Sequence, residues 1–361
     1  MDFHYPALTV NLPAIRQNAQ FICDKLGAYG IQVAGVIKFS DADRKVAEAY
    51  APCAQLAVSR CAHLRPLKEA FPEKKTLLTR APGLREMDEA ARFGDYILLS
   101  EKTTLRTLSD AALQAGTRPG VILMLDVGDR REGAVSIPDL VDLALFAEKE
   151  CPGVECKGVG TNVACLNGVL PDYENLSFLA EGAEAVEQAI GRPLEIVSGG
   201  STINMRLMTE GNGMPAKINH LRIGGFIANP MNMRINRGIA FSGMREDTHL
   251  LQAEIIELKE KDSAVSGATM NWAGQKIVTE DKGVRLRAIV EVGSQDIGDA
   301  SNLIPVEEGV QIIGSSSDHT ILDVTDCPQR LQVGDVLSFR MRYAALLYAY
   351  TGKHISRIYQ E

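Results

Sequence analysis

Hydrophobic and polar positions follow two different patterns along the chain, and the first pattern covers the larger part of it. From about residue 30 to 225, short apolar runs alternate with stretches whose apolar residues recur at helical spacing. The apolar runs span residues 33–38, 55–59, 76–80, 96–100, 121–126, 154–162, 195–198 and 220–223. Eight strands that are each followed by a helix are typical of a (β/α)₈ barrel. We therefore predict a barrel over residues 12–232. A doubly wound open sheet is the alternative, although it usually has fewer strands.

After about residue 235 the pattern changes to short apolar segments without helices between them. These segments span residues 250–257, 284–292, 310–313, 320–324 and 335–339, and Gly, Asp and Pro turns separate them. We predict a second, all-β domain over residues 233–361. A further strand at residues 7–11 precedes the first helix, and it could pair with either domain.

Composition and charge narrow the class of protein. The net charge is −8 and the basic residues are scattered, so we expect no binding to nucleic acid or to an anionic membrane. No apolar run reaches the roughly 18 residues of a membrane helix, and residues 1–12 do not resemble a signal peptide. We therefore expect a cytoplasmic protein. The seven cysteines form no CxxC pair and have no His at metal spacing, which predicts reduced thiols and no metal site.

Charged residues stand at or just after the ends of predicted strands, where barrel enzymes place their chemistry. Lys38 closes the first strand, and apolar surroundings there would make its amine nucleophilic. A lysine that simply extends to solvent is the alternative. Arg131 follows the fifth strand in a glycine-flanked polar loop, and an arginine can bind a carboxylate or phosphate through two hydrogen bonds. The alternative for this loop is a solvated, charged turn.

The loops after the seventh and eighth predicted strands are both rich in glycine and small residues. They read Ser198-Gly199-Gly200-Ser201-Thr202 and Arg222-Ile223-Gly224-Gly225. Phosphate sites of barrels lie after these two strands, where glycines let backbone N–H groups approach the anion. One end of the predicted barrel thus combines two phosphate-binding loops with an arginine and a lysine. This combination indicates a phosphorylated aldehyde cofactor, pyridoxal 5'-phosphate (PLP).

Six stretches, in order along the chain, resemble the alanine racemase superfamily of PLP enzymes (fold type III), and within it the ornithine racemase branch. They are GDRREG at 128–133, GTNVAC at 160–165, VSGGS at 197–201, NHLRIG at 219–224, SSDHTILDV at 316–324 and YAALL at 343–347. The resemblance implies a PLP-dependent racemase that interconverts L- and D-amino acids, with ornithine or a related basic amino acid as substrate. Alternatives are an alanine or broad-specificity racemase, an aldolase or decarboxylase on this fold, and a PLP carrier that consists of a barrel alone.

The resemblance also implies roles for individual residues. Lys38 matches the lysine that binds PLP covalently and removes the α-proton on one face of the substrate. Arg222 matches the arginine that faces the pyridine nitrogen, and Arg131 lies where the substrate carboxylate binds. Asn162 is expected to lie against the cofactor ring, and most of the other cofactor-binding residues are expected near its phosphate. The full set is Asn162, Ser198, Ser201, Thr202, Gly224, Gly225 and Tyr359.

The resemblance further implies a head-to-tail homodimer, in which a loop of the β-domain completes the partner's active site. Ser317, Asp318 and His319 correspond to that loop, with Ser317 expected near the substrate. Alanine racemases use a tyrosine as the second base, but the matching stretch 265–267 reads Val-Ser-Gly. Asp318 and His319 are therefore the first candidates for the second base, followed by Cys165 and Tyr343; a purely structural role is the alternative for His319. The distal ammonium of ornithine needs a carboxylate, and the candidates are Asp129, Glu132 and Asp296.

Overall fold

The chain divides into two compact units, each of which has its own sheet. The computed structural model describes residues 4–211, 213–265, 267, 269 and 280–361. The first unit is Leu12–Glu246, and the second combines the residues up to Asn11 with Asp247–Glu361. The first unit extends past residue 232 because Arg234 Nε contacts Glu246 Oε1 at 2.6 Å, which ties the segment after helix α10 (Pro230–Arg237) to this unit.

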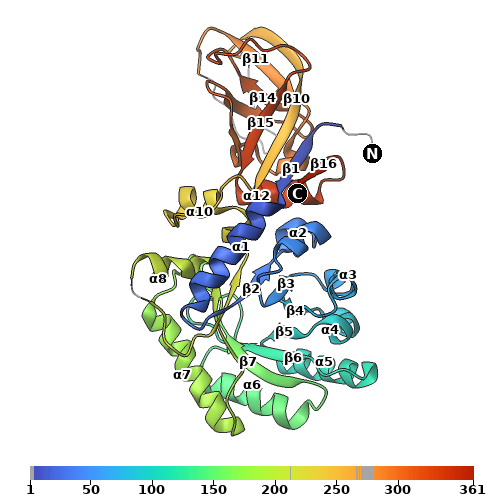
Figure 1. Cartoon of the computed structure of the whole chain (residues 1–361), viewed down its shortest axis with the longest axis vertical. Coiled ribbons are helices and arrows are strands. Elements are labelled where there is room, and N and C mark those ends of the chain that lie inside the picture. The colour runs from blue at the N-terminus through green and yellow to red at the C-terminus, as the bar shows by residue number, and fades with distance from the viewer. Residues whose placement is uncertain (1–3, 212, 266, 268, 270–279) are drawn as a thin grey trace. The chain divides into compact units, whose positions relative to one another are not determined.

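The first unit is a closed barrel of eight parallel strands surrounded by helices (Figure 1). Its strands are β2 (Gln32–Val36), β3 (Gln55–Val58), β4 (Lys75–Leu78), β5 (Tyr96–Leu99), β6 (Gly120–Met124), β7 (Glu155–Gly160), β8 (Ile196–Ser201) and β9 (His220–Ile223). Its α-helices, in addition to α10, are α1 (Leu12–Gly27), α2 (Arg44–Ala49), α3 (Leu64–Ala70), α4 (Met87–Phe93), α5 (Lys102–Ala115), α6 (Ile137–Glu150), α7 (Tyr173–Ile190), α8 (Met205–Thr209) and α9 (Gly225–Ala228). The predicted barrel is confirmed, and an open sheet is excluded.

The continuous apolar runs of the sequence become barrel strands because such strands are covered on both sides. Every residue of β3, β5 and β6 is buried, with the helices outside and other side chains inside. The side chains that pack together inside the barrel are Ala34, Ala57, Leu77, Tyr96, Leu98, Ile122, Met124 and Ile196. Caps fix the surrounding helices: the Ser136 hydroxyl accepts from Asp139 N at the start of α6, and Asp172 accepts from Asn175 N at the start of α7.

The second unit is built on a mainly antiparallel sheet, which confirms the predicted β-domain. Its strands are β1 (Ala7–Asn11), β10 (His249–Asp262), β11 (Val284–Val290), β12 (Leu303–Pro305), β13 (Gln311–Ser315), β14 (Thr320–Asp323), β15 (Val336–Met341) and β16 (Ser356–Gln360). The main strand order is β12-β15-β10-β11-β14-β13, and β1 pairs with both β10 and β16. The described residues of the unit also form the α-helices α11 (Ser294–Ile297) and α12 (Tyr343–Thr351). Helix α12 was not predicted, because its residues are apolar on every face and show no amphipathic period.

None of the helices among the described residues combines the length and the apolar character that a membrane crossing requires.

Candidate active site

Arg222 lies inside the barrel near the C-terminal ends of its strands. It stands on β9, where its register neighbours are Ala34 on β2 and Ser201 on β8, and its relative exposure is 4%. Its Nη1 donates to Ser198 Oγ at 2.5 Å, and its Nη2 donates to Thr161 O at 2.7 Å. Burial lowers the pKa of Arg222 to about 10, which still leaves it charged at neutral pH. The barrel therefore holds a desolvated cation through neutral acceptors on β8 and just after β7.

Lys38 opens a turn of 3₁₀ helix (Lys38–Ser40) two residues after β2 ends. Strand β2 pairs with β9, so the strand that leads to Lys38 and the strand that carries Arg222 are neighbours in the barrel wall. The Lys38 side chain is exposed, which agrees with the alternative of a lysine that extends to solvent and not with shielding by apolar surroundings. The reason is that the strand stops at Val36 and the chain turns at the barrel mouth, where the Ser40 N–H donates to Ile37 O.

The backbone directly after Lys38 is strained. Asp41 and Ala42 are consecutive non-glycine residues with positive φ angles of 53° and 56°. Left-handed backbone at such residues costs on the order of 1–3 kcal/mol each and persists only where its surroundings enforce it. Here Asp41 Oδ1 contacts His63 Nε2 at 2.9 Å on one side, and Asp43 caps α2 through Lys45 N and Val46 N on the other. The segment that positions Lys38 is therefore fixed at both ends.

The two glycine-containing loops meet beside β2. Ser201 ends β8, Thr202 opens the next turn, and the Gly224 N–H donates to Thr202 Oγ1 at 3.3 Å. A Cβ atom on Gly224 would lie 2.6 Å from the Val36 carbonyl oxygen, so only glycine allows this approach of the loop to β2. The residue that follows, Gly225, starts α9. The predicted phosphate-binding residues of the barrel are thus brought together by a direct hydrogen bond between their loops.

An unpartnered donor next to Arg222 shows that this place suits a polar ligand. Asn162 Oδ1 accepts a hydrogen bond from Arg222 Nη2 at 3.4 Å, whereas its Nδ2 is buried and has no partner among the described residues. A buried amide without a partner costs about 1–3 kcal/mol, which a bound acceptor would recover. PLP carries such acceptors in its phenolic oxygen, ring nitrogen and phosphate. Together with the Lys38 amine and the Thr202 loop, this donor set fits the cofactor.

Two carboxylates in the loop after β6 have different partners: Asp129 binds backbone N–H groups, whereas Glu132 pairs with the guanidinium of Arg131. Asp129 is buried and accepts four backbone N–H groups of residues 165–169, which lower its pKa even though burial acts to raise it. Arg131 is ion-paired with its neighbour Glu132, whose hydrogen bonds raise the pKa of the guanidinium. The charge of Glu132 also acts on Arg222 and partly offsets the effect of burial on its pKa. Asp129 is therefore a structural residue, while Arg131 and Glu132 face the Arg222 side of the barrel.

The remaining predicted site residues belong to the sheet unit, apart from Cys165, which is exposed on the barrel unit. Ser317, Asp318 and His319 are exposed between β13 and β14, and Asp318 Oδ1 accepts from Gln295 Nε2 at 2.9 Å. A Cβ on Gly293 would lie 2.2 Å from Ser317 O, so that glycine permits the loop to pack here. Tyr359 lies on β16 opposite Val10 of β1. Within the stretch 265–267, Ser266 lies outside the described residues.

Three residues of the site were not identified from the sequence. Thr161 supplies a carbonyl to Arg222, and its Oγ1 donates to Leu125 O at 2.7 Å. His220 and Gln55 form a buried polar chain with Ser198, described below. The available signal was a polar residue at the first position of a buried strand, which both Gln55 and His220 show.

No three His, Cys, Asp or Glu side chains in the described ranges lie close enough together to hold a metal ion. All seven cysteines are free thiols. Two of them, Cys23 and Cys53, approach with their sulfur atoms 3.8 Å apart.

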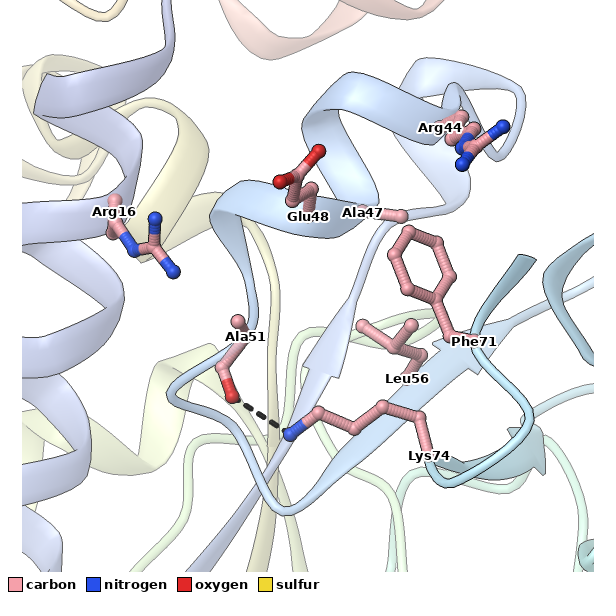
Figure 2. Close-up of a pocket in the computed structure, with 8 residues that line it drawn as sticks. All are labelled: Arg16, Arg44, Ala47, Glu48, Ala51, Leu56, Phe71 and Lys74. Carbon is pink, nitrogen blue, oxygen red and sulfur yellow. Dashed lines mark hydrogen bonds between the residues drawn. The ribbon is translucent and has the colours of Figure 1, made fainter.

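A pocket of about 350 Å³ on the barrel unit lies away from these residues. It is lined by the side chains of α1 and α2, by Leu56 of β3, and by Phe71 and Lys74 of the segment before β4 (Figure 2). Lys74 Nζ donates to the carbonyl oxygens of Ala51 and Cys53 at 2.7 and 2.6 Å, so its charge stabilises the turn before β3. The pocket lies toward the N-terminal ends of the strands, the barrel face that serves stability rather than chemistry.

The fold and the polar side chains around Arg222 define a (β/α)₈-barrel enzyme whose site lies at the C-terminal ends of its strands. Residues 10–228 match the family described as alanine racemase, N-terminal domain. The chain is 35% identical over 359 residues to the lysine racemase of Thermotoga maritima, with 99% of each chain covered. It is also 35% identical over 360 residues to the ornithine racemase of Acetoanaerobium sticklandii, with 98% of this chain and 99% of that protein covered.

Solved structures agree on the fold. The alanine racemase of Bacillus anthracis with bound L-Ala-P superposes with a TM-score of 0.73 at 16% identity, over 100% of this chain and 96% of that one. The chain belongs to the alanine racemase family, and it is an amino-acid racemase. The resemblance read from the six sequence stretches is confirmed.

Proposed function

We propose that this chain is a PLP-dependent racemase of a basic amino acid, ornithine or lysine. The observation that carries the proposal is Arg222, a buried cation held by neutral acceptors beside the strand that leads to Lys38. The full-length similarity to a lysine racemase and an ornithine racemase supports both the reaction and the substrate class.

The barrel residues would hold PLP by its two polar ends. Lys38 Nζ would hold the aldehyde carbon, Arg222 would face the ring nitrogen, and the loops at Ser201, Thr202, Gly224 and Gly225 would bind the phosphate. A guanidinium does not accept a proton, so Arg222 keeps that nitrogen unprotonated. When bound, PLP supplies a conjugated ring that accepts the electron pair released when the α-proton leaves. Ser198 acts through Arg222, to which it is hydrogen-bonded.

Racemisation needs one proton-transferring group on each face of the substrate α-carbon. Lys38 Nζ takes or returns the proton on one face. For the other face we propose His319 or Asp318 of a partner subunit in a head-to-tail homodimer. Both side chains are exposed in the sheet unit, as this role requires, and Gln295 orients Asp318. Ser317 would lie near the substrate on the same loop, and Tyr359 would contact the phosphate.

The structure favours one carboxylate for the distal ammonium of a basic substrate. The carboxylate of Asp129 is occupied by backbone N–H groups, and Asp296 caps α11 by accepting from Gly293 N. Among the residues that the structure describes, Glu132 is paired only with Arg131, which is the proposed site for the substrate carboxylate. The carboxylate of a basic substrate can pair with Arg131 while its side-chain ammonium pairs with Glu132, so that two ion pairs replace one. Alanine has no side-chain ammonium, so it can pair with Arg131 but leaves Glu132 without a cation.

Replacing Glu132 with Gln will lower kcat/KM for ornithine and lysine by about 10- to 100-fold, the effect of losing one charged contact. For alanine, kcat/KM will change by less than about threefold, because alanine has no distal ammonium. Chiral chromatography of the three reactions measures the effect. Glu73→Gln, at an exposed position before β4, is the matched control. An equal loss for all three substrates would contradict the proposed role of Glu132.

The experiment that tests the proposed function is α-proton exchange in D₂O with PLP-loaded protein, read alongside chiral chromatography. The panel contains L- and D-ornithine, lysine, alanine and serine. Deuterium incorporation together with formation of the enantiomer, fastest for ornithine or lysine, supports the proposal. Exchange with alanine alone indicates a different substrate. Release of carbon dioxide or of an aldehyde indicates a decarboxylase or aldolase, and PLP binding without exchange indicates a carrier.

A further inference from the structure

Beneath Arg222, a chain of three buried polar side chains crosses the barrel interior. Their relative exposures are 4% for Gln55, 1% for His220 and 0% for Ser198. His220 Nε2 lies 3.3 Å from Gln55 Oε1, and His220 Nδ1 lies 2.8 Å from Ser198 Oγ. The same Ser198 oxygen accepts from Arg222 Nη1. His220 and Arg222 are two residues apart on β9, so both side chains project to the same side of the strand.

The chemistry of the partners fixes where each proton lies. The amide oxygen of Gln55 can only accept, so the imidazole carries its proton on Nε2 and donates it to Gln55. His220 Nδ1 then has a free lone pair, and the Ser198 hydroxyl donates to it. With its proton directed at His220, the Ser198 oxygen presents its lone pairs to Arg222. Burial, and secondarily the charge of Arg222, lowers the pKa of His220 to about 3, so the ring stays neutral.

Any other protonation of His220 would weaken the hold on Arg222. An imidazole with its proton on Nδ1 would donate to Ser198, and the Ser198 proton would then be free to turn toward the guanidinium, where two donors repel. The remaining contacts of Arg222 are the Thr161 carbonyl and Asn162 Oδ1. Since no carboxylate of the described residues forms an ion pair with Arg222, its orientation depends on these neutral acceptors.

We propose that His220 is a positioning residue: as the neutral Nε2–H tautomer it directs the Ser198 proton away from Arg222 and so fixes the guanidinium toward the cofactor ring nitrogen. His220 itself contacts neither cofactor nor substrate in this arrangement. The orientation of Arg222 toward the cofactor rests on the proposed function. The hydrogen-bond pattern of Gln55, His220 and Ser198 does not depend on it. It adds Gln55 and His220 to the residues on which the reaction depends.

The hydrogen-bond pattern can be measured without turnover. In full-length protein labelled with ¹⁵N-histidine, the ring nitrogen shifts distinguish the two tautomers and the charged form. The protein has six histidines, so the His220 signals are assigned as those missing from the spectrum of His220→Asn. We expect the Nε2–H tautomer and no titration near the ordinary His pKa of about 6.5. An Nδ1–H tautomer, or titration near that value, would overturn the proposal.

Two variants separate positioning from packing. His220→Asn keeps an acceptor near the place of Nδ1, whereas His220→Leu fills similar space without one. We expect His220→Leu to lower kcat for the preferred substrate by about tenfold, the effect of one misdirected hydrogen bond, with KM changed by less than about threefold. His220→Asn should retain at least about a third of kcat. Urea unfolding of both variants checks that they fold.

The outcomes keep this inference apart from the proposed function. Equal losses of kcat in His220→Asn and His220→Leu, with both variants folded, would show that the acceptor at Nδ1 has no role and would overturn the inference. If wild-type protein turns over no amino acid, the proposed function fails instead. The NMR result then decides on its own whether His220 directs the Ser198 proton.

Discussion

Replacing Lys38 with alanine will reduce racemisation of every substrate by at least about 10³-fold, because the proton transfer on one face and the covalent link to PLP both depend on its amine. Chiral chromatography measures the first effect. The second is measured by reduction with borohydride followed by mass spectrometry, which will find PLP attached to the Lys38 peptide of wild-type protein and no attached PLP in the variant. The exposed position of Lys38 at the start of its turn means that the substitution removes a reactive group without opening a cavity.

Lys149→Ala is the matched control, since Lys149 is an exposed lysine near the end of α6 on the outside of the barrel. It should retain full activity and normal PLP attachment. Racemisation by Lys38→Ala within about tenfold of wild type would contradict the role given to Lys38, and so would PLP attached to another lysine.

Arg222→Met will lower kcat by about 10²–10³-fold, the usual loss when a preorganised charged donor is removed from an active site. Methionine has a similar length and no charge, so Ser198 Oγ and Asn162 Oδ1 lose their donor while most of the packing remains. Steady-state kinetics with the preferred amino acid measures the change, and the visible absorption spectrum reports the changed environment of the PLP ring.

Arg222→Lys gives a sharper comparison, because it keeps the charge but loses the planar fork that reaches both Ser198 and Thr161. If the fork matters, Arg222→Lys will be closer to Arg222→Met than to wild type. A lysine variant with wild-type kcat would show that charge alone is sufficient. A methionine variant with wild-type kcat would remove Arg222 from the site. Urea unfolding is measured in parallel to exclude loss of structure.

The barrel could be predicted from the sequence because its strands are short, apolar on both sides and regularly spaced by helices. Position at the strand ends singled out Lys38, Arg131 and the two glycine-rich loops, whereas the role of Arg222 came from the family resemblance. Helix α12 could not be predicted, because an apolar segment of nine residues fits a buried strand as well as a buried helix. Whether Lys38 is shielded or exposed stayed open, because the sequence does not show that the strand stops two residues earlier.

The sequence was least informative about contacts between different strands. Asp129 and Glu132 are nearly adjacent in the chain and looked equivalent as partners for an ammonium group. Only the fold shows that the backbone of residues 165–169 closes around Asp129, while Glu132 faces a guanidinium. The link from Gln55 to His220 likewise joins strands that are separated by most of the barrel sequence. Such pairings depend on strand register, which apolar patterns do not specify between distant segments.

The pairing of β1 with β10 and β16 makes the barrel an insertion within the sheet unit. The chain enters and leaves the barrel side by side, since Asn11 N donates to Thr248 O at 2.9 Å. During synthesis on the ribosome, β1 emerges before the barrel, whereas its partner strands β10 and β16 emerge only after the whole barrel has been translated. The sheet can form only after the barrel sequence is complete, so the order of folding follows from the topology: barrel first, sheet last.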